Sequence, residues 1–153
     1  MELAVNGTFK IYKPHCLGGE DYRVLTRLYL PIIGVDSFGL YHLLSVIDES
    51  ETHAFKFLLD SLNFPSVAYL DRAFSKLEAV SLIAAHHSKQ KDAYLFSVKA
   101  PLSAAAFSAH PLLFSFLRGQ IGELAADKLK VNGAVPPRGY KEITRSFDSV
   151  FDV

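Results

Sequence analysis

Histidine and cysteine are the side chains in this sequence that could bind a metal or act as a nucleophile. His15 and Cys16 are adjacent, but structural zinc needs about four ligands, usually in spaced pairs, and the sequence has no second pair. His86 and His87 are neighbours in a segment with strand character, so their side chains point to opposite faces and do not share a metal. This pattern predicts no metal site and no cofactor.

Cys16, His42 and the glycine pair at 18–19 have structural explanations. Cys16, the single cysteine, is expected to be a small buried hydrophobe rather than a nucleophile. His42 lies beside the apolar stripe of a predicted helix, where we expect a structural histidine with satisfied hydrogen bonds. Gly18-Gly19 lacks the lysine, the serine and the preceding buried strand of a phosphate-binding loop. No catalytic residue is predicted, and an enzyme with a histidine or Cys16 site stays an alternative that requires a convergent pocket.

Composition and charge limit the classes of protein to which this sequence can belong. The 153 residues are half hydrophobic and include twelve phenylalanines, enough for one domain with a substantial core. Sixteen basic residues balance sixteen acidic ones, so any electrostatic binding surface must be local. A single cysteine excludes an intrachain disulfide and fits a reducing compartment. Because the N-terminus lacks a signal-peptide pattern and no window approaches a membrane-spanning length, we expect a cytoplasmic protein.

Hydrophobic periodicity predicts a strand and four helices in the first half of the chain. The first helix is expected to end at Leu30, because Pro31 disfavours a helical conformation in the residue before it. Gly34 then permits a turn into the second helix. Ser66 is a natural N-cap for the fourth. The predicted elements are a strand at 8–12 and helices at 19–30, 36–47, 55–62 and 66–78.

A β-hairpin is predicted after the fourth helix. The apolar runs VSLIAAHH and AYLFSVK flank the polar loop SKQKD, and Tyr94, Phe96 and Val98 alternate on one face of the second strand. Three helices, a short turn, a helix and a two-stranded wing are the order of a winged helix-turn-helix domain. We therefore predict a mainly α fold with a small β-hairpin, in which residues 1–100 form a winged helix-turn-helix domain with a short N-terminal strand.

Residues 101–153 are predicted to be a C-terminal helical extension that packs on the same domain and serves self-association. Phe107 lies in an alanine-rich helix that breaks at His110-Pro111, and a longer helix follows as far as Leu124. The apolar arc of this helix is wider than one contact needs, which is typical of an interface. We expect a symmetric homodimer or a dimer of dimers. The predicted interface residues are Phe107, Leu112, Leu113, Phe116, Leu117 and Ile121.

Two surfaces of the predicted winged helix carry basic residues that could contact DNA. On the outward face of the fourth helix, two basic residues stand against Asp71 and Glu78, which favours a solvated helix face over a base-reading one. The hairpin tip is more basic, although exposed tips often carry lysine for solubility. We expect at most weak, sequence-independent binding. The candidate residues are Arg72, Lys76, His86, His87, Lys89 and Lys91.

Several segments, in the same order, resemble a known family. They are LYLPIIG (28–34), GLY (39–41), KLEAVSLI (76–83), YLFSVKAPLSAAAF (94–107) and YKEITRSFDSVF (140–151). These segments are similar to the bacterial replication initiation and membrane attachment proteins. That family comprises the DnaB/DnaD-type primosomal proteins, which are unrelated to the replicative helicase that shares one of those names. The chain resembles their N-terminal domain.

The resemblance implies a non-catalytic adaptor in DNA replication initiation. The family's N-terminal domain is a winged helix that mediates self-association, and its members help to load the replicative helicase alongside the initiator. The implied partners are further copies of this chain (a dimer or tetramer), other primosomal proteins and the helicase loader. The implied location is the cytoplasm, at the nucleoid or replication origin, with at most an indirect link to the membrane.

The sequence departs from the family pattern at two points. Ser81 stands where relatives usually place glycine before the wing, so the turn into the wing can differ. The chain is also shorter than family members and lacks their second helical domain, so we infer an N-terminal piece of a longer protein. The alternative function is a sequence-specific winged-helix transcriptional regulator that reads DNA with the helix at 66–78.

Overall fold

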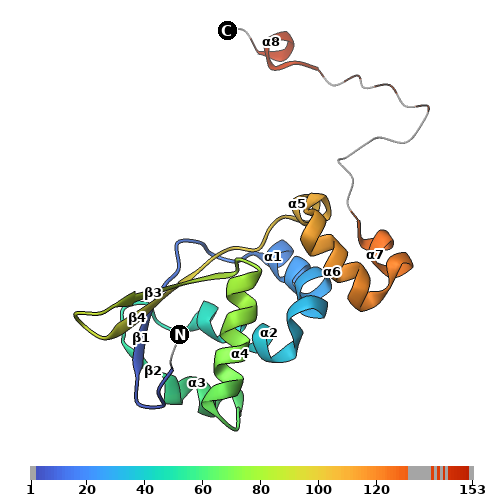
Figure 1. The fold of residues 1–153 in the computed structure, drawn as a ribbon. Helices are drawn as coiled ribbons and strands as arrows, with labels where there is room; N and C mark the ends of the chain where they lie inside the picture. Colours follow the sequence, from blue (N-terminus) through green and yellow to red (C-terminus); the bar gives the residue numbers. More distant parts are fainter. Residues whose placement is uncertain (1–2, 131–138, 140, 142, 144, 152–153) are drawn as a thin grey trace.

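The computed structural model describes residues 3–130, 139, 141, 143 and 145–151. A strand and three helical segments come first, followed by a short strand, two helices, a hairpin and the C-terminal helices (Figure 1). The strands are β1 (Thr8–Tyr12), β2 (His53–Ala54), β3 (Ile83–Ser88) and β4 (Ala93–Val98). The helices are α1 (Gly19–Val24), the π-helical segment η1 (Leu25–Tyr29), α2 (Leu30–Val46), α3 (Phe55–Leu62), α4 (Val67–Ala79), α5 (Ala104–Ala109), α6 (Pro111–Ile121), α7 (Glu123–Leu129) and α8 (Phe147–Val150).

The four strands form one sheet in the order β2-β1-β4-β3. β3 and β4 are antiparallel, with Ala85 opposite Phe96, which confirms the predicted hairpin. β1 confirms the strand predicted at 8–12, and it pairs in parallel with β4, with Ile11 opposite Phe96. Neither this pairing nor the two-residue strand β2, which pairs with β1, is predicted by the sequence pattern. The N-terminal strand therefore belongs to the same sheet as the wing.

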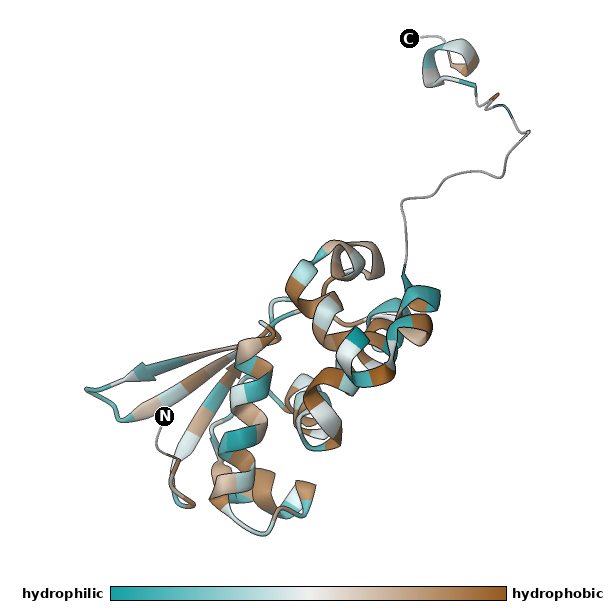
Figure 2. Ribbon diagram, turned by 45° about the vertical axis from the view of Figure 1, so that its right-hand side comes forward, coloured by the Kyte–Doolittle hydropathy of each residue, from teal (hydrophilic) through white to brown (hydrophobic). Residues whose placement is uncertain are grey.

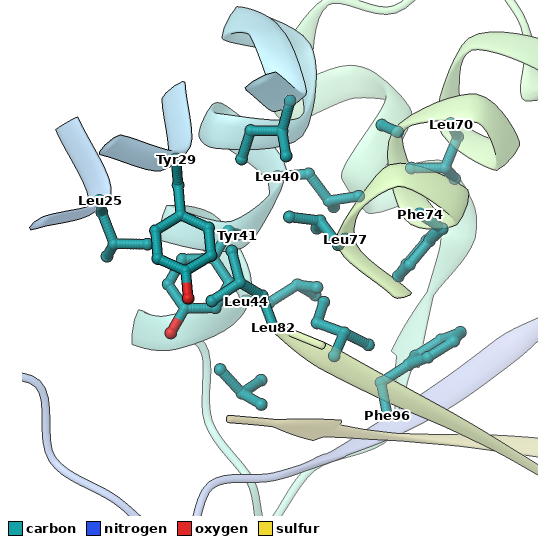
Figure 3. Close-up of a cluster of buried hydrophobic side chains, with 14 of the residues drawn as sticks. Leu25, Tyr29, Leu40, Tyr41, Leu44, Leu70, Phe74, Leu77, Leu82 and Phe96 are labelled. Carbon is teal, nitrogen blue, oxygen red and sulfur yellow. The ribbon is translucent and has the colours of Figure 1, made fainter. Parts of the chain in front are cut away.

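The winged-helix core lies between the sheet and helices α2, α3 and α4. On α4 the buried residues recur at helical spacing, and the ring of Phe74 stacks on that of Phe96 with centroids 4.4 Å apart. Figure 3 shows Leu70, Phe74 and Leu77 of α4 pointing toward the residues of α2 and the sheet. Hydrophobic and hydrophilic residues alternate along the helices (Figure 2). The winged helix-turn-helix fold is confirmed.

The corner between the first two helices differs from the expectation. The helix does not end at Leu30, because the amide of Leu30 donates to the carbonyl of Leu25, five residues earlier, in the π-helical segment η1. Pro31 then occupies the first turn of α2, where a missing amide hydrogen costs nothing. The break falls at Gly34, with φ 81° and ψ 169°. Gly34 therefore redirects the chain, as predicted for its turn, and Pro31 does not stop the helix.

The helical segment Gly19–Val46 is long and apolar enough to cross a membrane by length and composition, contrary to the expectation from sequence. Its helical geometry is interrupted at Gly34, and Leu25, Leu40 and Leu44 lie in the core, whereas Val35 and Val46 are exposed. Tyr41 is also buried, and its hydroxyl donates to the backbone carbonyl of Lys99 at 2.5 Å. Burial, and next the charge of Asp21, raise the pKa of Tyr41. The segment thus contributes large buried side chains to the core, while 33% of its apolar window is buried.

The C-terminal helices α5, α6 and α7 pack on the winged helix and share its hydrophobic core. The ring of Phe107 meets Tyr29 edge-on at 5.0 Å between centroids, and the amide of Leu102 donates to the Tyr29 hydroxyl at 3.0 Å. α6 begins after His110, as predicted, and the His110 Nδ1 accepts a hydrogen bond from the amide of Leu113. The predicted continuation to Leu124 is wrong, because Gly122, at φ 92°, separates α6 from α7.

The turn into the wing holds Ser81 at φ 63°, a left-handed conformation. That conformation favours glycine, the residue expected from the family pattern at this position. Ser81 donates its amide to the carbonyl of Glu78 at 3.1 Å, which closes the turn after α4. The turn therefore keeps the conformation that glycine would adopt, and Ser81 has the backbone strain of a side-chain-bearing residue at positive φ.

Candidate functional site

An apolar cavity of about 270 Å³ lies where α2, α4 and α6 meet. Most of its lining is apolar, and the exposed side chains of Leu112 and Phe116 from α6 form one wall. Leu113 of α6 also borders the cavity, and the remaining residues come from the start of α2 and from the end of α4 with the residue after it. The full lining is Ile32, Ile33, Lys76, Ala79, Val80, Leu112, Leu113 and Phe116.

The predicted interface residues divide into two groups. Phe107, Leu113 and Leu117 are buried inside the chain, Leu117 at 0% exposure, because that face of α6 and the α5 aromatic complete the core. Phe107 and Leu117 are therefore covered by the chain itself, whereas Leu113 borders the cavity, and the assignment of these residues to an interface stays a prediction. Ile121 is partly buried against the same core.

Leu112 and Phe116 are 62% and 60% exposed and lie one turn apart on α6. They precede the buried Leu113 and Leu117 by one position each, so they occupy the neighbouring side of the helix. The whole apolar arc is predicted as an interface from the sequence, because helical spacing alone does not show which part of the arc the domain itself covers. The structure narrows the exposed part of the predicted interface to these two side chains and the cavity beside them.

The outward face of α4, which corresponds to the recognition helix of DNA-binding winged helices, carries few groups suited to reading bases. The guanidinium of Arg72 lies 5.5 Å from the ring centroid of Tyr69 on the same helix. Lys76 lines the apolar cavity next to Phe116 of α6, so a duplex that approached Lys76 would meet an apolar wall. Asp71 on this helix adds negative charge. The arrangement disfavours α4 as a base-reading helix.

The wing tip is a separate basic surface. His86 and His87 lie on β3, and their side chains are exposed to solvent. The Nε2 of His87 is 3.1 Å from the carboxylate of Asp92, and its ring lies 4.5 Å from that of Tyr94. Lys89 and Lys91 are exposed, and within the described part of the chain neither forms a salt bridge. The structure thus does not bring Arg72 and Lys76 together with the wing residues in one contact, and DNA binding by either set stays a prediction.

The residues first considered for chemistry form no reactive pair. Cys16 is exposed, so the prediction that it is buried is wrong. It lines a cavity of about 380 Å³ with His15, Tyr22 and Glu49, yet no hydrogen bond joins Cys16 to a histidine among the described residues. In the same part of the chain no group of three or more His, Cys, Asp or Glu residues is arranged to hold a metal ion. The cavity therefore offers neither an activated nucleophile nor a ligand set.

His42 also differs from its prediction. Its Nε2 is buried and has no hydrogen-bond partner among the described residues, so it is not a satisfied histidine. The imidazole instead lies between aromatic rings, 5.3 Å from Tyr22 and 4.4 Å from Phe38 between centroids. Burial lowers the pKa of His42. The residue acts as a neutral aromatic packing group at neutral pH.

Comparison with known proteins matches residues 4–153 to the model of the DnaB N-terminal winged helix domain. The chain is 28% identical over 155 aligned positions to the replicative helicase loading/DNA remodeling protein DnaB of Staphylococcus aureus, covering 95% of this chain and 33% of that protein. It also superposes on the crystal structure of primosome protein DnaB, residues 1–300, from Geobacillus stearothermophilus, with a TM-score of 0.80 and 25% identity, covering 96% of this chain and 59% of that one.

The chain therefore spans about a third of the length of the curated relative and somewhat over half of the solved one. Both relatives are named for helicase loading or the primosome, which supports the replication reading over a transcriptional regulator. The sheet with its wing and the helix order of the structure agree with the family model, which matches nearly the whole chain. On this sequence match and this fold, the chain belongs to the DnaB N-terminal winged helix domain family.

Proposed function

We propose that this chain is a non-catalytic adaptor module in DNA replication initiation, which supports helicase loading by self-association and protein contacts. The names of its relatives support this role. The module would act in the cytoplasm at the replication origin, and any link to the membrane would be indirect. Its proposed partners are the helicase loader and other primosomal proteins.

The observation that carries the proposal is the apolar cavity beside Leu112 and Phe116. The two side chains protrude from α6, while the cavity they flank is a recess lined by α2 and α4. One surface thus offers both a projection and a recess, which is what a two-fold symmetric contact between identical chains requires. A second copy related by a two-fold axis could place its Phe116 in this cavity and receive the first copy's Phe116 in return.

The expected strength of this contact is moderate. Leu112 and Phe116 are each about 60% exposed, and burying them fully in both copies of a dimer would contribute roughly 4–7 kcal/mol. Association costs roughly 4–15 kcal/mol in lost translational and rotational freedom, so these four side chains do not suffice alone. The surrounding apolar lining, including Ile32 and Val80, must contribute too. We therefore expect a reversible dimer whose population depends on concentration.

The test is the molecular mass of the chain in solution as a function of concentration, measured by sedimentation equilibrium. The variant Leu112→Ser/Phe116→Ser is expected to stay folded and monomeric where the wild type is dimeric, because both side chains are exposed. The control Val46→Ser/Phe57→Ser also removes one exposed aliphatic and one exposed aromatic side chain, away from the cavity, and is expected to dimerise normally. A wild type that is monomeric at high concentration, or a test variant that still dimerises, would contradict the proposal.

A further inference from the structure

The C-terminal end of the chain carries apolar side chains at helical spacing that are exposed to solvent. Ile143 is 86% exposed, Val150 is 55% exposed and Phe151 is 57% exposed. With Phe147 they follow the spacing of one helical face in the sequence. The helical turn α8 lies apart from the domain in two views (Figures 1 and 2). An apolar stripe of this kind is typical of a segment that packs on another surface.

The turn α8 is defined by the local sequence but is too short to be stable alone. The amide of Ser149 donates to the hydroxyl of Ser146 at 3.3 Å and to its carbonyl at 3.2 Å, which caps the turn. A single helical turn in water does not offset the cost of its own nucleation. We therefore expect the turn to gain stability by placing its apolar face in a groove, as amphipathic helices do.

The apolar cavity beside Leu112 and Phe116 has the character that this turn needs. Its lining is apolar except for Lys76, which forms no salt bridge among the described residues. Asp148 of α8 precedes Phe151 by three positions and therefore lies beside the apolar stripe. A pair between Asp148 and Lys76 would orient the docked turn more than it would strengthen docking, because exposed pairs contribute little.

The point at which the chain leaves the domain places the tail within reach of this cavity. The Nζ of Lys130, the residue after α7, lies 5.6 Å from the ring centroid of Phe114 on α6. Phe114 points away from Leu112, so a path to the cavity passes around α6, whose diameter is roughly 10–12 Å. The residues 131–144 that connect Lys130 to Arg145 can span up to roughly 50 Å when extended. The covalent connection thus permits the tail to occupy the cavity of its own chain.

A tethered segment has an advantage over a second copy as the occupant of this cavity. The effective concentration of a segment on a short linker is on the order of millimolar, whereas a second copy must arrive from solution. A cavity filled by the tail has no room for Phe116 of a second copy. Occupancy by the tail and the two-fold contact proposed above therefore exclude each other.

We propose that the tail segment 147–151 packs in the apolar cavity of its own chain and thereby limits self-association. The limiting effect rests on the proposed function, in which a second copy uses the same cavity. The tail is an internal competitor, and a dimer forms only between chains whose cavities are open.

The first test compares the dimer dissociation constants of full chains by sedimentation equilibrium. The test variant is Val150→Ser/Phe151→Ser, and the matched control is Val46→Ser/Phe57→Ser, which removes the same two exposed residue types elsewhere. If the tail fills half of the cavities or more, at most about a quarter of chain pairs have both cavities open. The dissociation constant of the test variant should therefore be at least about fourfold lower than that of the wild type and the control.

The second test locates the tail directly, without any reference to the dimer. A nitroxide spin label is attached at residue 149 of the variant Cys16→Ser/Ser149→Cys, and Cys16 is exposed, so its replacement is expected to leave the fold intact. The amide signals of Val80 and Leu112 should broaden in the NMR spectrum, and that of Lys89 on the wing should stay sharp. Adding Val150→Ser/Phe151→Ser should restore the broadened signals.

The outcomes separate this proposal from the one on which it rests. Sharp signals at the cavity, or a test variant that dimerises like the wild type or more weakly while the control dimerises normally, would overturn tail occupancy. Broadening that appears only when spin-labelled chains are mixed with isotope-labelled ones would overturn it in favour of tail exchange between copies. If all forms stay monomeric, the proposed self-association fails, and broadening within one chain would still support docking of the tail.

Discussion

Replacing Gly34 by alanine tests backbone strain without adding a steric clash. Gly34 has φ 81° and ψ 169°, a region that residues with a side chain rarely adopt, and an added Cβ would meet no atom within 4 Å. The substitution therefore creates no clash, and its cost is conformational, about 1–3 kcal/mol. Alanine also restricts the unfolded chain, which recovers about 0.4–1 kcal/mol.

The expected net loss for Gly34→Ala is about 1–2 kcal/mol of unfolding free energy. At roughly 2–4 °C per kcal/mol for a domain of this size, the Tm should fall by about 2–8 °C. Thermal and urea unfolding, followed by circular dichroism, measure both quantities. Gly122→Ala, at φ 92° and with equally open surroundings, should lose a similar amount.

Gly119→Ala is the matched control, because Gly119 lies inside α6 without a positive φ and its Cβ would also meet nothing within 4 Å. Alanine is preferred over glycine in a helix interior by about 0.8–1 kcal/mol, so this variant should gain stability. A Gly34→Ala protein that melts at the wild-type temperature, or that gains stability as the control does, would refute the strain argument.

Two further predictions concern DNA and pH. Lys89→Glu/Lys91→Glu should abolish the weak affinity of the wing for duplex DNA in an anisotropy titration, whereas Arg72→Ala should change it little; tight binding that needs Arg72 and one base sequence would reverse this ranking. Burial lowers the pKa of His42 in the folded chain. As the pH falls below about 6.5, the ordinary pKa of histidine, His42 is protonated in the unfolded chain before it is protonated in the folded chain. The stability that neutral His42 contributes is therefore fully present above about pH 6.5 and is lost as the pH falls below that value. His42→Phe should reduce the fall in Tm between about pH 7 and pH 5, and an unchanged fall would show that other groups cause it.

The elements predicted best from the sequence are those whose apolar residues recur at one regular helical or strand spacing. The helix α4 and the hairpin were predicted nearly to the residue, because Leu70, Phe74 and Leu77 follow helical spacing and Phe96 and Val98 follow strand spacing. The parallel pairing of β1 with β4 could not be predicted in this way, since it joins segments far apart in sequence. The end of the first helix was misplaced because a π-helical turn accommodates Pro31, and composition does not reveal such a turn.

The candidate surfaces were only partly predictable, for a related reason. Phe116 and Leu117 are adjacent and equally apolar, and only the packing of α6 on the domain shows that the first is exposed and the second is core. A cavity lined by Arg23, Arg27 and Lys128 is less visible still in the sequence, because Arg23 and Lys128 are separated by most of the chain. A clue was available in the spacing of Arg23 and Arg27, but nothing in the sequence places α7 beside them.

The parallel pairing of β1 and β4 has a consequence for how the chain acquires its structure during synthesis. β1 leaves the ribosome well before its partner strand β4, which ends at Val98. At roughly 5–20 residues per second, β1 therefore waits several seconds with an unpaired edge before the strand beside it exists. Such non-local pairing slows folding relative to local helix contacts. We therefore expect the N-terminal strand to pair late, after the helices between the two strands have collapsed.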